Sequence, residues 1–122
     1  MSTGKMLRHH MIESIKLLAS DGAVQLSCYP DFVCKGDEIA NSLGDWLFMY
    51  QQASASENDQ VFLPEELRQI VGLDEDIAFL DPEDFSDDAI LNSPNWQRIR
   101  EKAKKVLLLL NEEYSLPDKR YI

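Results

Sequence analysis

Apolar residues recur at the spacing of an amphipathic α-helix in four segments of the chain, while strand-like alternation is almost absent. The repeating residues are Leu7, Met11, Ile15 and Leu18 in the first segment; Ile39, Leu43, Trp46, Leu47 and Tyr50 in the second; Leu67, Ile70, Val71 and Ile77 in the third; and Trp96, Ile99, Ala103, Val106, Leu107 and Leu110 in the fourth. This pattern predicts an all-α bundle of four main helices, over about residues 5–20, 37–53, 64–80 and 94–114.

Local signals mark where these helices begin. Pro64 and Pro94 suit the first turn of a helix, where the missing N–H is not needed. Ser93 is the expected N-cap of the last helix, and Asp37 is the expected N-cap of the second. Gly72 weakens the middle of the third helix and could divide it into two. Additional short helical turns are expected, including one over residues 86–91.

One stretch does not fit the helical pattern. Val24, Leu26 and Cys28 stand at alternate positions, as in a strand, but the sequence offers no second strand to pair with them. Because a lone strand cannot satisfy its backbone hydrogen bonds, we expect a short helix or an ordered extended connection instead. Phe32 and Val33 at its end are expected to pack on the core.

Composition sets the broad class. With 122 residues, of which 44% are hydrophobic, the chain is long enough to form one domain, over residues 1–122, with a substantial core. No apolar run approaches the roughly 20 residues that span a bilayer, and the start of the chain lacks the apolar stretch of a secretory signal. We therefore expect a soluble, cytoplasmic protein without membrane contact, in which Cys28 and Cys34 are reduced.

The formal net charge of −10 arises in one block of the sequence. Outside this block, eleven Lys and Arg residues stand against ten Asp and Glu residues. Inside it, Arg68 is the single base among twelve acids: Glu57, Asp59, Glu65, Glu66, Asp74, Glu75, Asp76, Asp81, Glu83, Asp84, Asp87 and Asp88.

The last predicted helix carries the opposite charge. Its bases are Arg98, Arg100, Lys102, Lys104 and Lys105, with Glu101 as the single acid among them. They could form a basic strip that binds RNA or an acidic protein. We favour a solvated flank whose basic groups neutralise part of the acidic block, because the nearby negative field would repel a phosphate backbone. Nucleic-acid binding is therefore not expected.

The sequence shows no assembled catalytic site, and we assign no catalytic, cofactor-binding or metal-ligating residue. His9 and His10 are adjacent on a helix and diverge by about 100°, so ligation of one ion by both is disfavoured. The acidic block does not match a calcium-binding loop. Asp84, Asp87 and Asp88 could share a helix face and hold Mg²⁺ or Mn²⁺, which leaves a metal-dependent hydrolase as an alternative, although a facing pair of carboxylates is missing.

The remaining hypothesis is a non-catalytic interaction domain, since concentrated carboxylates attract and orient a basic protein partner. This physical description is similar to that of bacterial immunity and antitoxin proteins, which inhibit basic toxins. A third alternative is a structural subunit that self-associates through Phe48 and Met49, and we expect a monomer or a weak homodimer. Apolar anchors for a partner could be Phe62, Phe79 or Phe85. The predicted partner-binding residues are Asp74, Glu75, Asp76, Glu83, Asp84, Phe85, Asp87 and Asp88.

Overall fold

The all-α prediction is confirmed by a computed structural model that describes residues 2–55 and 59–122. Regular structure in these residues is helical throughout, and they contain no strand. The elements are α1 (Thr3–Ala19), α2 (Gly22–Ser27), α3 (Lys35–Ala53), α4 (Pro64–Ala78), the 3₁₀ turn η2 (Pro82–Phe85), α5 (Asp87–Asn92) and α6 (Pro94–Leu109).

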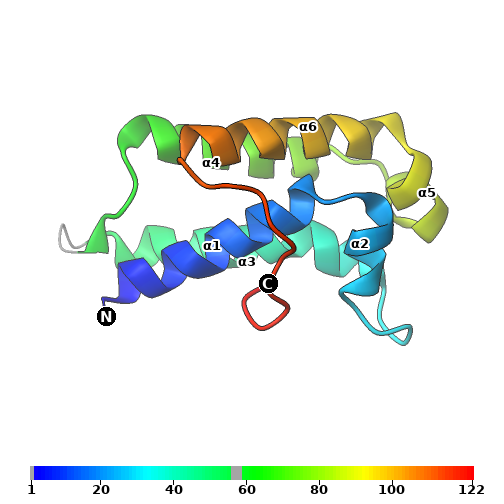
Figure 1. Cartoon of the computed structure of the whole chain (residues 1–122), viewed down its shortest axis with the longest axis horizontal. Helices are drawn as coiled ribbons and strands as arrows, with labels where there is room; N and C mark the ends of the chain where they lie inside the picture. Colours follow the sequence, from blue (N-terminus) through cyan, green and yellow to red (C-terminus); the bar gives the residue numbers. More distant parts are fainter. Residues whose placement is uncertain (1, 56–58) are drawn as a thin grey trace.

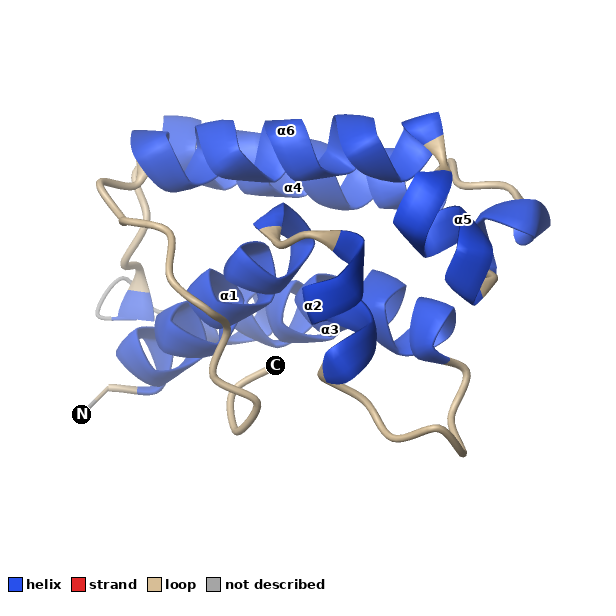
Figure 2. Cartoon of the chain, turned by 45° about the vertical axis from the view of Figure 1, so that its right-hand side comes forward, coloured by secondary structure: helices blue, strands red, loops and turns tan. Residues whose placement is uncertain are grey.

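The four long helices form two neighbouring pairs. α1 packs on α3, α4 packs on α6, and contacts of α1 with α6 and of α3 with α4 join the pairs (Figure 1). The short helices α2 and α5 contact each other at one end of the molecule (Figure 2). The apolar stripes of the long helices meet between the pairs, where Met11, Leu43, Ile70 and Trp96 are fully buried.

The predicted helix starts are mostly correct. Pro64 and Pro94 occupy the first positions of α4 and α6, and the Ser93 hydroxyl accepts a hydrogen bond from the Asn95 N–H at 3.1 Å. The prediction for Asp37 is wrong, because α3 begins two residues earlier and Asp37 lies inside its first turn, where the helix dipole favours a carboxylate. Gly72 does not divide α4, which is continuous.

The predicted end of the last helix is also wrong. The helix stops at Leu109 instead of residue 114, because Asn111 adopts the left-handed conformation with φ of 58°. The N–H of Glu112 then donates to the Leu107 carbonyl at 2.9 Å, and the N–H of Asn111 donates to the Leu108 carbonyl at 3.1 Å. This pair of bonds is the Schellman motif. At this end of the helix, Leu107 and Leu110 are buried, whereas Leu108 is 75% exposed.

Residues after α6 run back across α1 as an extended tail (Figure 1). The N–H of Asp118 donates to the buried Glu13 carboxylate at 2.9 Å, and His10 Nδ1 donates to the carbonyl oxygen of Tyr121 at 2.8 Å. The His10 ring also stacks on Trp46 of α3, with 3.7 Å between ring centroids. His10 therefore has a packing role that connects α1, α3 and the tail.

The ambiguous stretch after α1 resolves into the short helix α2, one of its two predicted forms. The loop that follows differs from expectation at Phe32, which is 90% exposed, while Val33 is half-buried. A turn at Pro30, whose carbonyl accepts the Val33 N–H at 3.3 Å, directs the Phe32 side chain away from the core. Cys28 and Cys34 are free thiols.

Arg100 does not belong to the basic flank predicted for the last helix. It is buried where α1, α2, α5 and α6 meet, and its guanidinium donates to the carbonyl oxygen of Ser20 at 3.1 Å, to the carbonyl oxygen of Ile90 and to the side-chain oxygen of Gln25 at 3.1 Å. Burial lowers the pKa of Arg100, and nearby Asp21 partly offsets this effect. Arg100 therefore supplies hydrogen-bond donors to carbonyl groups near helix ends.

Candidate functional site

An acidic groove lies between α3 and α4. Its volume is about 360 Å³. α3 supplies one wall, α4 supplies the other, and the segment leading into η2 closes one end. The lining residues are Asp37, Ala40, Asn41, Gly44, Asp45, Asp74, Ile77, Ala78, Leu80 and Phe85, so the charged side chains in the lining are all aspartates.

Helix spacing brings the polar groups of α3 to this groove. Asp37, Asn41 and Asp45 are four residues apart and therefore share one face of the helix. Gly44 on the same face allows α4 to approach closely, since a Cβ atom there would lie 3.0 Å from Asp74 Oδ1. Gly36 does the same for η2, whose backbone at Phe85 fills the space that a Cβ would need.

The electrostatics of the groove centre on Asp74. Burial raises the pKa of this half-buried carboxyl group, and the neighbouring charges of Asp45 and Glu75 raise it further. Across the described residues, the ion pairs of the chain include neither Asp74 nor Asp37 nor Asp45. The groove therefore holds concentrated negative charge beside apolar side chains, an arrangement suited to a cationic group on an apolar segment.

The other acids predicted to bind a partner lie on the surface, with the exception of Asp84. Glu75, Glu83, Asp87 and Asp88 are exposed. Asp76 is also on the surface, but its carboxylate pairs with Lys102 Nζ at 2.7 Å, which neutralises it locally. Glu57 of the same acidic block lies outside the described residues.

Asp84 differs from these exposed acids, because it is buried and fully engaged in structure. Its Oδ1 accepts from the Ser93 hydroxyl at 2.9 Å, and its Oδ2 accepts from the Asn95 amide and the Asp81 N–H, both at 3.0 Å. Its backbone carbonyl accepts from Trp96 Nε1 at 2.7 Å. This carboxylate ties η2 to the start of α6 and is not available to a partner.

The three aspartates of the hydrolase alternative are not brought together as metal ligands. Among the residues that the structure describes, no group of three or more His, Cys, Asp or Glu side chains could hold a metal ion. Asp87 and Asp88 lie in the first turn of α5, whereas the Asp84 side chain is held by donors on η2 and α6. The observed geometry gives this alternative no support.

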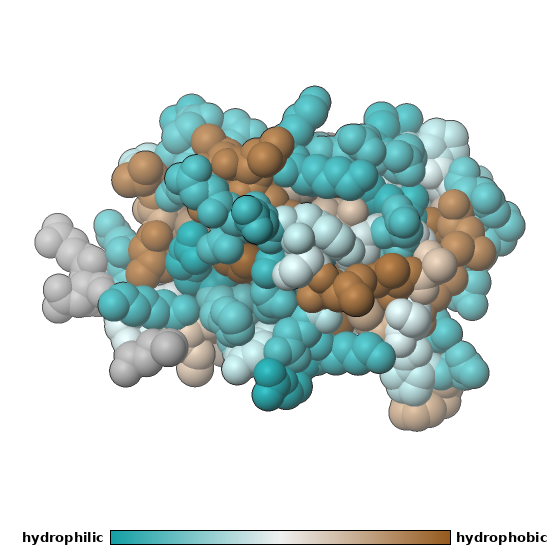
Figure 3. All heavy atoms as spheres, in the orientation of Figure 1, coloured by the Kyte–Doolittle hydropathy of each residue, from teal (hydrophilic) through white to brown (hydrophobic). Residues whose placement is uncertain are grey.

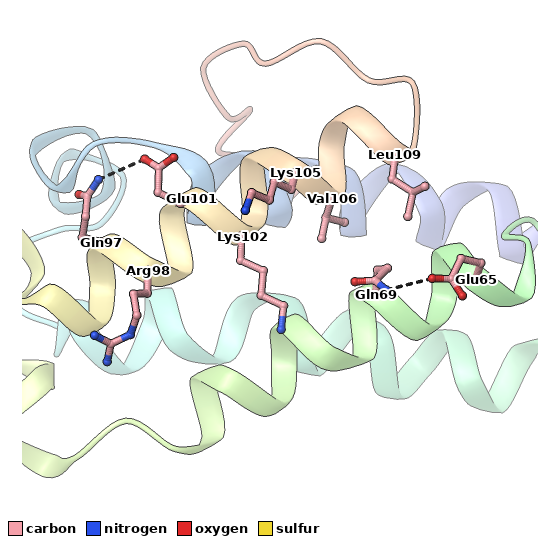
Figure 4. Close-up of a pocket in the computed structure, with 9 residues that line it drawn as sticks. All are labelled: Glu65, Gln69, Gln97, Arg98, Glu101, Lys102, Lys105, Val106 and Leu109. Atoms are coloured by element: carbon pink, nitrogen blue, oxygen red, sulfur yellow. Dashed lines mark hydrogen bonds between the residues drawn. The ribbon is translucent and has the colours of Figure 1, made fainter.

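A second groove, of about 640 Å³, separates α4 from α6 and has the opposite character (Figure 4). Arg98, Lys102 and Lys105 of α6 line it, and Lys102 extends toward α4. Glu65 and Glu101, which also line it, pair with Arg68 and Lys104. Within the described residues, the predicted neutralisation of part of the acidic block by this helix includes the ion pair of Lys102 with Asp76.

The predicted apolar anchors are not equally accessible. Phe79, directly after α4, is 85% exposed, whereas Phe62 packs edge-on against Tyr50 and Phe85 is half-buried in the groove wall. Phe48 and Met49, the predicted self-association surface, are 63% and 48% exposed. On the face shown in Figure 3, apolar residues form separate patches among polar ones. No helix in the described residues has the length and hydropathy needed to cross a bilayer.

Sequence reasoning missed Asp37 and Asp45 as functional candidates. Both lie outside the acidic block along the chain, and the folding of α3 against α4 brings them into the same groove as Asp74. The signal that could have identified them is the polar and small face of α3, formed by Gly36, Asp37, Asn41, Gly44 and Asp45 at helical spacing.

Comparisons with known proteins identify no relative. No protein-family model, curated protein or solved structure matches this chain. The proposal that follows therefore depends on the geometry and charge of the grooves alone.

Proposed function

We propose that this protein is a non-catalytic interaction domain that binds a basic segment of a protein partner in the groove between α3 and α4. An inhibitor of a basic toxin, of the immunity or antitoxin type and acting in the cytoplasm, is the most specific form of this proposal.

The proposal rests on one observation, that the half-buried carboxyl group of Asp74 lies near other acids. A half-buried carboxylate is normally paired or hydrogen-bonded, because burial without compensation destabilises the charged form. Asp74 instead lies beside Asp45 and Glu75, so burial and both neighbouring charges oppose its ionisation. A cationic side chain from a partner would supply the missing counter-charge, so the groove gains favourable electrostatic energy on binding.

Apolar surface supports the same proposal. Ile77, Leu80 and Phe85 line the groove beside the aspartates, and Phe79 extends from the end of α4 into solvent. Apolar and aromatic anchors provide most of the binding energy in many interfaces, whereas surrounding charges mainly increase the association rate. We assign the second role to the exposed acids Glu75, Glu83, Asp87 and Asp88.

Affinity capture with charge-matched variants tests the proposal. Wild-type protein, the groove variant Asp37→Asn/Asp45→Asn/Asp74→Asn and the control variant Glu65→Gln/Glu101→Gln/Glu113→Gln are immobilised, and proteins from a lysate of the source cells are applied. Both variants lose three negative charges, but the control changes exposed acids outside the groove. Circular dichroism verifies that both variants are folded.

The expected result is one basic protein that the wild type and the control retain at low salt and release at high salt, and that the groove variant does not retain at either salt concentration. A specific partner that the groove variant retains as well as the wild type, at both salt concentrations, would contradict the proposal. The alternatives of a metal-dependent hydrolase and of a self-associating subunit stay predictions, as do the monomer or weak homodimer and the lack of nucleic-acid binding.

A further inference from the structure

A smaller pocket opens beside the acidic groove, on the same helix. Its volume is about 190 Å³, and it shares Asn41 and Asp45 with the groove. Trp46 and Tyr29 provide aromatic walls, and Glu38 lies with Asp45 among the polar lining residues. No Lys or Arg lines this pocket.

Packing holds both aromatic walls in place. His10 of α1 stacks on Trp46 with 13° between the ring planes, which fixes the indole while leaving it in the pocket lining. Tyr29 is half-buried at the end of α2. Burial raises the pKa of Tyr29 to about 12, and nearby Cys28 and Glu38 add smaller contributions. The pocket therefore combines two aromatic side chains that are held by packing with two exposed carboxylates.

This combination favours one chemical class of ligand. Aromatic faces attract cations through their quadrupole, and carboxylates attract them through charge, whereas an anion or a neutral polar group would gain from neither. The aliphatic stem of a Lys or Arg side chain can lie on aromatic and thioether surface while its head reaches a carboxylate. Met49 in the lining adds such surface.

We propose that this pocket binds the cationic head of a Lys or Arg side chain from the basic partner, while the rest of the partner's segment lies in the adjoining acidic groove. The inference depends on the proposed function, which it deepens by identifying a specificity pocket. Asp45, at the boundary of the two cavities, faces both parts of the bound segment.

Indole NMR resonances test the pocket directly. The chain has two tryptophans, and Trp96 is fully buried with its Nε1–H donated to the Asp84 carbonyl, so its resonance is an internal control. The ¹⁵N-labelled full chain is titrated with hexalysine, with hexaarginine and with hexalysine acetylated on its six Nζ atoms. Calorimetry on the same samples gives the overall affinity.

The expected result is a saturable shift of the Trp46 indole resonance with hexalysine or hexaarginine, and no shift with the acetylated peptide. The Glu38→Gln variant should weaken that response roughly threefold or more, while Glu113→Gln, an exposed acid on the tail, should not. The larger shift of the two cationic peptides identifies the preferred head group.

Two results would overturn the inference, and they are distinguishable. If calorimetry shows peptide binding that Asp74→Asn weakens, but the Trp46 resonance does not move or moves equally with the acetylated peptide, the pocket assignment is wrong and the proposed function stands. If neither cationic peptide binds the wild type, or if Asp74→Asn and Asp37→Asn leave binding unchanged, the proposed function fails together with the pocket.

Discussion

Asp84 and Asp74 belong to the same acidic block, but their surroundings give them opposite roles. Burial alone would raise the pKa of Asp84, yet hydrogen bonds from Asn95, the Asp81 N–H and Ser93 outweigh burial and lower it. Asp74 has a raised pKa because burial and two neighbouring carboxylates act on it, and no donor among the described residues compensates for them. The contacts of each carboxylate therefore separate a structural acid from a candidate binding residue.

Replacement of Asp84 tests its structural role. Asp84→Asn removes the charge that three donors contact, and we expect it to lower the free energy of unfolding by about 1–3 kcal/mol at neutral pH. A folded-state pKa below the unfolded value stabilises the protein above the ordinary carboxyl pKa near 4, and this stabilisation is lost as the pH falls through the folded-state pKa. Urea denaturation of both proteins between neutral and acidic pH should show the difference shrinking below about pH 4.

Glu83→Gln is the matched control, since Glu83 is exposed in the same 3₁₀ turn and its replacement removes the same charge. It should change stability by less than about 0.5 kcal/mol. Equal stability losses in the two variants would mean that net charge, and not the Asp84 contacts, explains the effect.

The helices were predictable wherever the signal was local. The Ser93-Pro94 start and the buried stripe of α1 follow from capping chemistry and 3.6-residue periodicity. Asp37 misled the prediction because an acidic residue suits both an N-cap and the first turn that follows it. The end of α6 was missed because its apolar run continues to Leu110, while the stop depends on the backbone conformation of Asn111.

Two substitutions at Asn111 test this stop. Glycine adopts a positive φ without a steric cost, so Asn111→Gly should leave the stability within about 0.5 kcal/mol of the wild type. Asn111→Ala places a Cβ without a compensating polar group in the left-handed region and should destabilise the fold by about 1 kcal/mol. Thermal unfolding of the wild type and the two variants gives their order of stability. An alanine variant as stable as the glycine variant would contradict a Schellman motif at this residue.

In the whole molecule, folding brings acids that are far apart in the sequence into one groove. Asp74 and Phe85 belong to the part of the sequence predicted to bind a partner, whereas Asp37 and Asp45 reach the same groove through the packing of α3 on α4, which the sequence pattern does not reveal. As expected, the bases of α6 neutralise part of the acidic block. Arg100 turns into the core, and within the described residues Lys102 alone pairs with an acid of the block from this helix.

The tail that follows α6 is held against α1 by hydrogen bonds to Glu13 and His10. A chain that ends at Leu116 loses the hydrogen bonds from the Asp118 N–H to Glu13 and from His10 to Tyr121, and also the ring contacts of Tyr121 with both histidines. We expect a stability loss of roughly 1–3 kcal/mol and a melting temperature several degrees lower. An unchanged melting temperature would show that the tail does not stabilise the helices.

The most direct test of the central claim is a ¹³C NMR titration of the Asp74 carboxyl group in the free protein and in the protein saturated with hexalysine. We expect the pKa of Asp74 to lie above the ordinary aspartate value in the free protein. It should be lower in Asp45→Asn, because one repelling charge is removed, and it should fall on hexalysine binding, because a cation enters the groove. An Asp74 pKa at the ordinary value in the free protein, unchanged by saturating hexalysine, would contradict the assignment of this groove as the docking site for a basic partner.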